Sequence, residues 1–433
     1  MDTRSKLTID RLYIFSFIAV LVLLPWSLRL SVDAFIVAAV FGLLTTGLKE
    51  KIQRIRQHQP VFIFILFYLL YILGLLYTDN IAEGLKSVEQ KLALLAIPFI
   101  AASSISFTDR QRKWAMFAFV YTNALLTVVC VILNVVSVTR GEPSQINFDI
   151  HTLARFNELH AGVNPVWMQF SYIGFANSIM HPTYFSIYLT LCILILFYYN
   201  PSTVKQEYLK YAVIAWFSIV IILLSSRMGI FILLSTGLLN LLYYLFKRNF
   251  AVRESLLSIV FTLAVCSLIL FFPVTRFRVI EEPLSTPLAL PSNPVKWNSV
   301  NLRFLEWKAG IEGIKKHLVI GTGTGGTSEV LHQYYTQVDL GDFSKYYNAH
   351  NQYIQTYLEI GIAGVVVLIL CFFIPIVYAV KSRNKVLLSL VIMICLGCLS
   401  EGMLERGRGL IFYMSFVSLF MFTKNKYDNE AEE

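Results

Sequence analysis

The chain has 433 residues, of which 56% are apolar and only 15% are charged, with a mean hydropathy of +0.63. Soluble domains carry about 25% charged residues, so this composition excludes an ordinary soluble protein and predicts an integral membrane protein. The formal net charge of +9 is explained by basic loops between apolar segments, so no nucleic acid partner is needed to account for it.

Apolar runs recur along the whole chain, close to the roughly 20 residues that a helix needs to cross the hydrocarbon core. Each run is expected to be helical, because an unpaired backbone group costs several kcal/mol in lipid. The expected fold is therefore all-α, a single integral membrane domain over residues 1–433 with about twelve transmembrane helices. The runs cover residues 12–28, 32–48, 61–77, 90–105, 114–138, 181–199, 211–225, 228–246, 255–272, 356–380, 386–400 and 409–423.

The basic residues between these runs predict the orientation. With the N-terminus in the cytoplasm and alternating crossings, more than half of the Lys and Arg residues fall on the cytoplasmic side, as the positive-inside rule expects. Both termini are then cytoplasmic, and the longest outer segment, residues 273–355, lies between the ninth and tenth runs. We therefore expect a multi-pass inner-membrane protein with one large outer loop.

The first third of this loop contains five prolines, which predict irregular backbone rather than a helix. They are Pro273, Pro283, Pro287, Pro291 and Pro294. The following stretch, "NSVNLRFLEWKAGIEGIKKHLVIGTGTGG", has apolar residues at helical spacing, and Asn298 or Ser299 is placed to cap its start. We expect an amphipathic helix there, ended by the glycine cluster, and a further helix in the tyrosine-rich stretch before His350.

The glycine cluster Gly321–Gly326, "GTGTGG", formally matches G-x-G-x-x-G. A dinucleotide site needs a strand before this motif and a helix after it, whereas a helix is expected to precede it here. A helix-terminating turn or a phosphate-binding nest of backbone amides is favoured instead. The sequence also lacks G-x-x-x-x-G-K-[ST] and any D-x-D pair, so neither ATP hydrolysis nor a bound metal or other cofactor is expected.

Three residues on the outer side carry side chains suited to group transfer. Arg227, in "SSRMG", is held near the membrane surface by a short turn between two runs, where a snorkelling anchor is the alternative. Arg303 opens the amphipathic segment, where a solvated helix face is the alternative. His350 precedes the tenth run in "NAHNQYIQTYLEIGIAG", where it is otherwise a polar interfacial residue.

Together these residues predict a reaction type. Imidazole titrates near neutrality and can accept a proton from a hydroxyl nucleophile. Guanidinium groups bind diphosphates through charge-assisted, bidentate hydrogen bonds, so two of them can neutralise a leaving diphosphate without a metal. We expect a hydroxyl, activated by His350, to attack an anomeric carbon whose lipid diphosphate leaving group is held by Arg227 and Arg303, with inversion.

The sequence resembles the O-antigen ligase and O-antigen polymerase superfamily of bacterial envelope enzymes. The resemblance extends over nearly the whole chain, and "NAHNQYIQTYLEIGIAG" is its most specific motif. Other matching stretches are "LGLLYTDN" (Leu73–Asn80), "SSRMG" (Ser225–Gly229), "NLRFLEWKAG...GTGTGG" and "SEGMLERGRGLIFYMSFVSLFMF". The last of these looks like ligase-type members from Gram-negative bacteria.

The resemblance implies transfer of a glycan from an undecaprenyl-diphosphate carrier at the periplasmic face. The family's loop histidine falls on His350, and its two functional arginines fall on Arg227 and Arg303. Topology alone adds further candidates for the site, and the polar motif adds one more. These are Arg408, Glu405, His181 and Asn351.

The resemblance leaves the acceptor open. Ligases use a sugar hydroxyl of lipid A–core, polymerases use another lipid-linked repeat, and protein O-oligosaccharyltransferases share the same loop motif. From a different class, a transporter for lipid-linked sugars would need charged residues lining a path through the spans, and the predicted spans carry few. A purely structural membrane scaffold gives no reason for two arginines and a histidine on one face.

Overall fold

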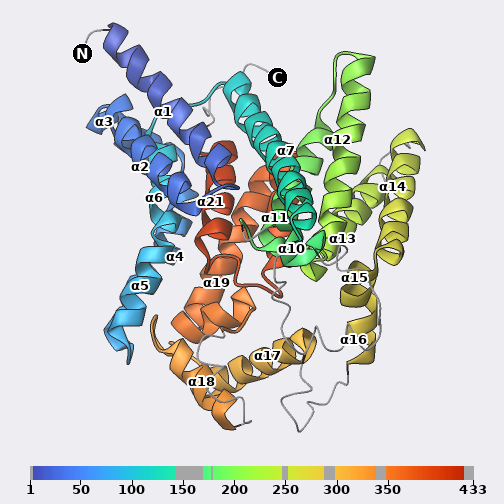
Figure 1. Cartoon of the computed structure of the whole chain (residues 1–433). Coiled ribbons are helices and arrows are strands. Elements are labelled where there is room, and N and C mark those ends of the chain that lie inside the picture. The colour runs from blue at the N-terminus through green and yellow to red at the C-terminus, as the bar shows by residue number, and fades with distance from the viewer. Residues whose placement is uncertain are drawn as a thin grey trace. The chain divides into compact units, whose positions relative to one another are not determined.

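The computed structural model describes residues 3–141, 169–176, 179–245, 252–286, 298–337 and 348–423. Every regular element in these residues is helical and none is a strand (Figure 1), which confirms the predicted all-α class. The chain divides into two compact units, Met1–Phe119 with Arg303–Glu433 and Val120–Leu302. We call these the first and the second unit.

Several helices are long and apolar enough to span a membrane. Among the described residues, four qualify singly, and there are up to six spans if each of two sharply bent helix pairs is one span. Four shorter apolar helices have 10–17 residues. The chain is thus a membrane-type helical protein, and the count of about twelve spans stays a prediction.

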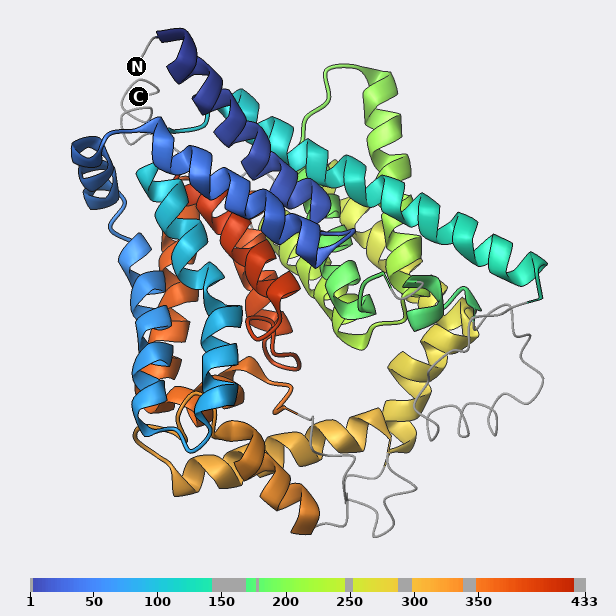
Figure 2. The same cartoon turned by 60° about the vertical axis from the view of Figure 1, so that its left-hand side comes forward.

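The first unit is organised around α19, which packs against α4 and α20, while α21 packs against α6 and α1 against α2 (Figure 2). Its core is built from aromatic and aliphatic side chains such as Phe64, Tyr71 and Tyr413, which are fully buried. Its elements are α1 (Thr3–Leu23), α2 (Leu28–Thr45), α3 (Leu48–Gln57), α4 (Val61–Leu73), η1 (Gly74–Tyr77), α5 (Ile81–Lys91), α6 (Ala93–Ser103), the start of α7 (Asp109–Thr139), most of α17 (Ser299–Lys316), α18 (Thr327–Gln337), α19 (Gln352–Lys381), α20 (Lys385–Gly397) and α21 (Gly407–Met421).

The second unit is a bundle in which α11 packs against α12 and α13, and α13 packs against α14. α11 is almost completely buried along its length. The elements of the unit are the rest of α7, α10 (Tyr172–Ala176), α11 (Pro182–Tyr198), α12 (Val204–Leu223), α13 (Arg227–Leu245), α14 (Val252–Phe271), α15 (Pro273–Arg276), the π-helical turn η2 (Phe277–Glu281), α16 (Glu282–Ser285) and the start of α17.

The predicted irregular backbone at the start of the long loop is wrong where the structure describes it. Residues 273–285 are helical throughout, as α15, η2 and α16. Pro273 lies in the first turn of a helix, after the extended Phe272, where the missing N–H has no intrahelical partner to lose and the fixed φ suits the helix. Pro283 directly follows the π-helical turn η2 inside the same helical stretch. Pro287, Pro291 and Pro294 lie outside the described residues.

The predicted amphipathic helix is confirmed as α17. Asn298 caps its start, because its side-chain oxygen accepts hydrogen bonds from the backbone N–H of Val300 and of Asn301, both at 3.0 Å. A further helix, α18, follows within the same segment, and residues 338–347 of the stretch before His350 lie outside the described residues. The two helices therefore flank the glycine cluster.

The glycine cluster packs backbone against backbone in the first unit. Thr322 N donates to Leu358 O at 2.6 Å, Thr324 N to Gly74 O at 3.2 Å and Gly325 N to the Thr78 hydroxyl at 2.9 Å. A Cβ on Gly325 would lie 2.0 Å from a backbone oxygen of Asn80, so the approach requires glycine. These amides are bound to protein oxygens, which argues against the phosphate-nest interpretation.

The glycine cluster packs against a break in α19. Ile360 and Gly361 depart from helical geometry, and Gly361 has φ of +66°, a conformation that glycine adopts at little cost. The break leaves the Leu358 carbonyl free of its helical role, and Thr322 donates to it through both its backbone N–H and its hydroxyl. As a result Glu359, the next residue, is fixed inside the unit with 4% exposure.

Candidate functional site

His350 is held by a short turn whose geometry its neighbours dictate. The side-chain oxygen of Asn348 accepts a hydrogen bond from His350 N at 3.0 Å, a local turn typical of asparagine. Asn351 then caps α19, because its side-chain oxygen accepts from Tyr353 N and Ile354 N. His350 itself adopts φ of +41°, a costly conformation for a non-glycine residue that is concentrated at functional sites.

The His350 side chain lies in a closed ring of charged groups with Arg303, Glu306 and Glu401, which we call the histidine cluster. His350 Nδ1 lies 3.3 Å from Glu401 Oε2, and His350 Nε2 lies 3.8 Å from Glu306 Oε1. Arg303 closes the ring through its Nη1 to Glu306 at 3.0 Å and its Nη2 to Glu401 at 2.8 Å. All four residues belong to the first unit, so the structure brings two of the three predicted site residues, His350 and Arg303, together.

The geometry of the histidine cluster favours one tautomer of His350. Because an ionised carboxylate only accepts hydrogen bonds, the shorter contact has Nδ1–H donating to Glu401. Nε2 is then the unprotonated nitrogen, and its 3.8 Å separation from Glu306 is too long for a hydrogen bond. An orienting carboxylate on one nitrogen and a basic lone pair on the other is the arrangement of a general base.

Glu306 is the most buried member of the histidine cluster, with only 3% of its side chain exposed. Burial raises the pKa of Glu306 above its ordinary value, and electrostatic interactions with His350 and Arg303 oppose that shift without cancelling it. Glu306 is therefore a carboxylate held at some cost inside the unit, where Arg303 supplies its main hydrogen bond.

Arg227 lies in the second unit, at the first residue of α13. Its Nε donates to Arg278 O at 2.6 Å, its Nη1 to the Ser299 hydroxyl at 2.9 Å, and its Nη2 forms an ion pair with Glu282. Glu282 is fully buried, whereas 27% of the Arg227 side chain is exposed. The guanidinium is therefore anchored from one side and still reaches solvent.

His181, a further candidate from the sequence, caps a helix in the second unit. Its Nδ1 accepts a hydrogen bond from Thr183 N at 3.4 Å at the start of α11. Pro182 follows it at the first helical position, the usual place for proline. The structure thus gives His181 a clear structural role, and the same is true of Asn351, which caps α19 and also donates to Leu399 O.

Glu405 belongs to a second buried cluster of the first unit. Lys91 lies between two carboxylates, with its Nζ 2.5 Å from Glu405 Oε2 and 3.4 Å from Glu359 Oε2. Gln352 donates to Glu405 at 2.6 Å, and Gln355 donates to Glu359 at 2.8 Å. We call these five residues the lysine cluster. Arg408 is half-buried in the first turn of α21 and is not a member of either cluster.

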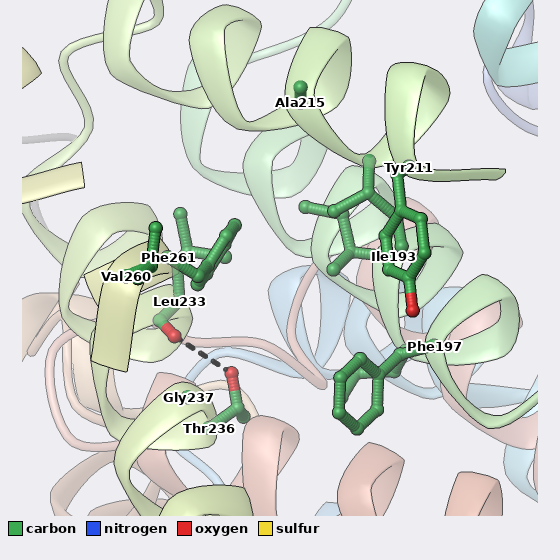
Figure 3. Close-up of a pocket in the computed structure, with 11 residues that line it drawn as sticks. Ile193, Phe197, Tyr211, Ala215, Leu233, Thr236, Gly237, Val260 and Phe261 are labelled. Carbon is green, nitrogen blue, oxygen red and sulfur yellow. Dashed lines mark hydrogen bonds between the residues drawn. The ribbon is translucent and has the colours of Figure 1, made fainter. Parts of the chain in front are cut away.

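The two units each contain a cavity, and the cavities differ in chemistry. Figure 3 shows the cavity of the second unit, about 280 Å³ in volume, lined by residues such as Ile193, Phe197 and Leu233 from α11 and α13. Its threonine hydroxyl, on Thr236, donates back to Leu233 O. The cavity of the first unit, about 320 Å³ in volume, is instead lined mainly by polar and charged side chains, Glu359 and Glu405 among them. Among the described residues, no group of His, Cys, Asp and Glu side chains is arranged to hold a metal ion.

Several residues of the histidine and lysine clusters, and Glu282 beside Arg227, were not predicted from the sequence. Glu306 follows Arg303 by three positions on a helix, a spacing at which an ion pair is expected, so that signal was present. Glu359 and Lys91 are isolated charges inside apolar runs, which also mark function. Glu401 and Glu282 had no such signal, because they are separated from His350 and Arg227 by 51 and 55 positions.

Comparison with known proteins relates part of the chain to a described family. Residues 212–369 match the model of a family described as O-antigen ligase, which confirms the resemblance for the motifs that lie within these residues. The matched residues include Arg227, Arg303 and His350. A protein of Haemophilus influenzae, described as uncharacterized, is 27% identical over 134 residues, a match that covers 28% of this chain and 34% of the relative. The chain thus covers about a third of that relative's length.

Proposed function

We propose that this chain, an O-antigen ligase-like membrane protein, transfers an O-antigen-type glycan from undecaprenyl diphosphate to a sugar hydroxyl of lipid A–core at the periplasmic face. The family match indicates glycan transfer of the ligase or polymerase type. The observation that supports the chemistry best is the contact between His350 and Glu401, because it gives the imidazole a carboxylate partner on one nitrogen and leaves the other available for a proton.

The proposed step is a single displacement. The acceptor hydroxyl gives its proton to His350 Nε2 while its oxygen forms a bond to the anomeric carbon of the glycan. The bond from that carbon to the diphosphate oxygen breaks on the opposite face, so the configuration inverts and undecaprenyl diphosphate leaves as an anion. His350 then returns the proton to water, and Glu401 keeps the ring oriented throughout.

The diphosphate is assigned to Arg227 and Arg303. Both guanidinium groups are partly exposed, at 27% and 30% of their side chains, so both keep N–H groups that a ligand can reach. Their carboxylate partners hold them in fixed orientations, which reduces the entropy lost when an anion binds. Metal independence is part of the proposal, and full transfer activity in EDTA is expected, whereas strict dependence on a divalent ion would contradict it.

The placement in the cell is also proposed rather than observed. Basic loops favour cytoplasmic termini, with about twelve spans in one membrane domain and residues 273–355 as a periplasmic loop between the ninth and tenth spans. α17 and the histidine cluster would then lie on the periplasmic side, where lipid-linked glycans and lipid A–core are both available.

The glycolipids of a bacterial strain test this function directly. The strain lacking the gene is compared with strains carrying the wild-type chain, His350→Ala or the control His317→Ala, a half-exposed histidine of the same unit. A ligase gives lipid A–core without glycan, and full-length polymer on undecaprenyl diphosphate, in the null and His350→Ala strains only. Lipid A–core carrying a single repeat would instead identify a polymerase, and unchanged pools would refute glycan transfer and favour a lipid-linked sugar transporter.

A further inference from the structure

The polar cavity of the first unit lies outside the histidine cluster, and no step of the proposed reaction uses it. Its walls come from α5, from the glycine cluster and the first turn of α18, from Asn348 beside His350, from α19 and from residues 405–406. We propose that this cavity binds one hydroxylated sugar ring of a glycan substrate. The inference rests on the proposed function for the origin of that sugar, but the binding itself is a separate property.

The charges around the cavity argue for a neutral, hydroxyl-rich ligand. Three carboxylates line it, on Glu83, Glu359 and Glu405, against the cations of Lys86 and Arg406. Lys91 neutralises part of the acidic charge from behind, through its ion pairs with Glu359 and Glu405. A diphosphate would meet as many carboxylates as cations here, whereas sugar hydroxyls can donate to carboxylates and accept from amides and amines.

Glu359 supplies a buried carboxylate to the wall of this cavity. Glu359 is 4% exposed, and its Oε2 accepts no hydrogen bond from any described residue, with Lys91 Nζ at 3.4 Å. The ion pair with Lys91 keeps this carboxylate charged and in place, so the cavity wall carries a fixed acceptor for the hydroxyl groups of a sugar. Gln355 beside it, 6% exposed, donates to Glu359 Oε1, so the amide and Lys91 together fix the orientation of the carboxylate.

The cavity is coupled to the segment that carries His350. Gln355 Oε1 accepts a hydrogen bond from Ala349 N at 3.1 Å, and Asn348 Oδ1 accepts from His350 N at 3.0 Å. Both Gln355 and Asn348 line the cavity. A sugar ring bound there would therefore touch the two side chains that hold the His350 turn in its left-handed conformation, one on each side of the histidine.

The size suits a single ring. About 320 Å³ lies at the small end of the roughly 300–1,000 Å³ typical of ligand pockets. The ring has two available sources, the acceptor sugar that supplies the attacking hydroxyl or a sugar of the donor glycan. Both present the same hydroxyl chemistry, so the experiment has to separate them.

Saturation-transfer NMR on the full-length protein in detergent tests the binding, with free glucose, galactose and N-acetylglucosamine as probes. At least one sugar should bind saturably to the wild-type protein, and inorganic diphosphate should not displace it. Ser328→Trp places an indole at the exposed mouth of the cavity and should weaken that binding by about tenfold or more, equivalent to about 1.4 kcal/mol. Ser328→Ala leaves the cavity open and should bind as the wild type does.

The matched control is Glu329→Trp, the same bulky residue one position further along α18, where the side chain is exposed and does not line the cavity. Gln90→Trp fills the cavity from α5 instead and keeps the test decisive should Ser328→Trp fail to fold. No saturable sugar binding to the wild type, or equal binding in both cavity-filling variants, would refute the cavity as a sugar site.

Steady-state transfer then identifies the source and separates the two proposals. A rise in KM for lipid A–core in Ser328→Trp would identify an acceptor sugar, and a rise in KM for the undecaprenyl-linked donor would identify a donor sugar. His350→Ala should keep the sugar binding and lose transfer. If sugar binds as expected but no glycan is transferred by the wild type, the cavity site stands and the proposed function fails.

Discussion

Arg303 in the first unit and Arg227 in the second both bind carboxylates, and they differ in what those carboxylates also contact. The partners of Arg303, Glu306 and Glu401, both face the His350 ring. The partner of Arg227, Glu282, receives a hydrogen bond from the Ser299 hydroxyl. One arginine is thus tied to the imidazole of His350 through its carboxylate partners, while the other is fixed by a carboxylate, a hydroxyl and a backbone carbonyl.

In the transfer that we propose, this difference separates two tasks. Binding a lipid diphosphate needs a positive charge held in place, which the surroundings of Arg227 provide. Moving a proton needs a base whose orientation is fixed, which the histidine cluster provides. Arg303 takes part in both, because it binds both carboxylates that contact His350 while about a third of its side chain stays exposed.

The largest expected effect is the loss of the base. His350→Ala should lower kcat for transfer by about 10²–10⁴-fold, the usual contribution of general acid–base catalysis, while the affinity for the lipid-linked donor stays nearly unchanged. Transfer kinetics and donor binding on the purified protein measure both quantities. His181→Ala removes a histidine that caps α11 and should reduce stability more than chemistry. Full activity in His350→Ala would remove the histidine from the mechanism.

A smaller effect is expected when His350 is left intact but loses its partner. Glu401→Gln keeps the shape of the side chain yet weakens its contacts with His350 and Arg303, so kcat should fall by about 10²-fold, the scale of a misplaced catalytic group. The KM for the donor should change much less. The exposed Glu329→Gln serves as the control. A large change in donor KM with normal kcat would instead assign Glu401 to substrate binding.

The helices of the long loop show which structural features can be predicted from the sequence. The spacing of Leu302, Leu305 and Ala309 predicts α17 correctly, because burial of one face is a local pattern that repeats every three or four residues. Pro273 misleads, because the effect of a proline depends on its position, and in the first turn it is compatible with a helix.

The side chains assigned to the reaction can be predicted from the motifs, whereas the carboxylates that contact them cannot. The motifs single out His350, Arg303 and Arg227, but Glu401 and Glu282 reach them only through tertiary packing, across 51 and 55 positions. Lys91 and Glu405 are 314 positions apart, so no local spacing predicts that they meet in the lysine cluster. Identifying those partners requires knowing which helices meet, and that is decided by packing rather than by periodicity.

A more modest effect distinguishes the two arginines from each other. Lysine keeps the charge but lacks the planar fork that binds two oxygens at once, so each Arg→Lys change should cost about tenfold, near the 1.5 kcal/mol of one charged hydrogen bond. Arg303→Lys should act mainly on kcat, because Arg303 holds Glu306 and Glu401. Arg227→Lys should act mainly on the KM for the donor, and a harmless change at either arginine would favour a solvated or snorkelling side chain there.

The smallest effect concerns stability and follows from the raised pKa of Glu306. A carboxyl whose pKa is higher in the folded chain binds its proton more tightly there than in the unfolded chain, so the wild type loses stability as pH rises from about 4.5 through the raised pKa. Glu306→Gln cannot ionise and escapes this loss. The apparent Tm of Glu306→Gln, measured relative to that of the wild type at the same pH, should therefore increase as pH rises.

The expected gain is about 1–2 °C, since one kcal/mol shifts Tm by only about 2–4 °C even in a domain of 150–250 residues. Glu312, on the same helix, provides a control of opposite sign. It is exposed, and its hydrogen bond with Lys315 lowers the pKa of its carboxyl. The apparent Tm of Glu312→Gln, relative to that of the wild type, should therefore decrease slightly as pH rises. Parallel slopes for the two variants would mean that burial does not distinguish Glu306, and that the histidine cluster is open to solvent in solution.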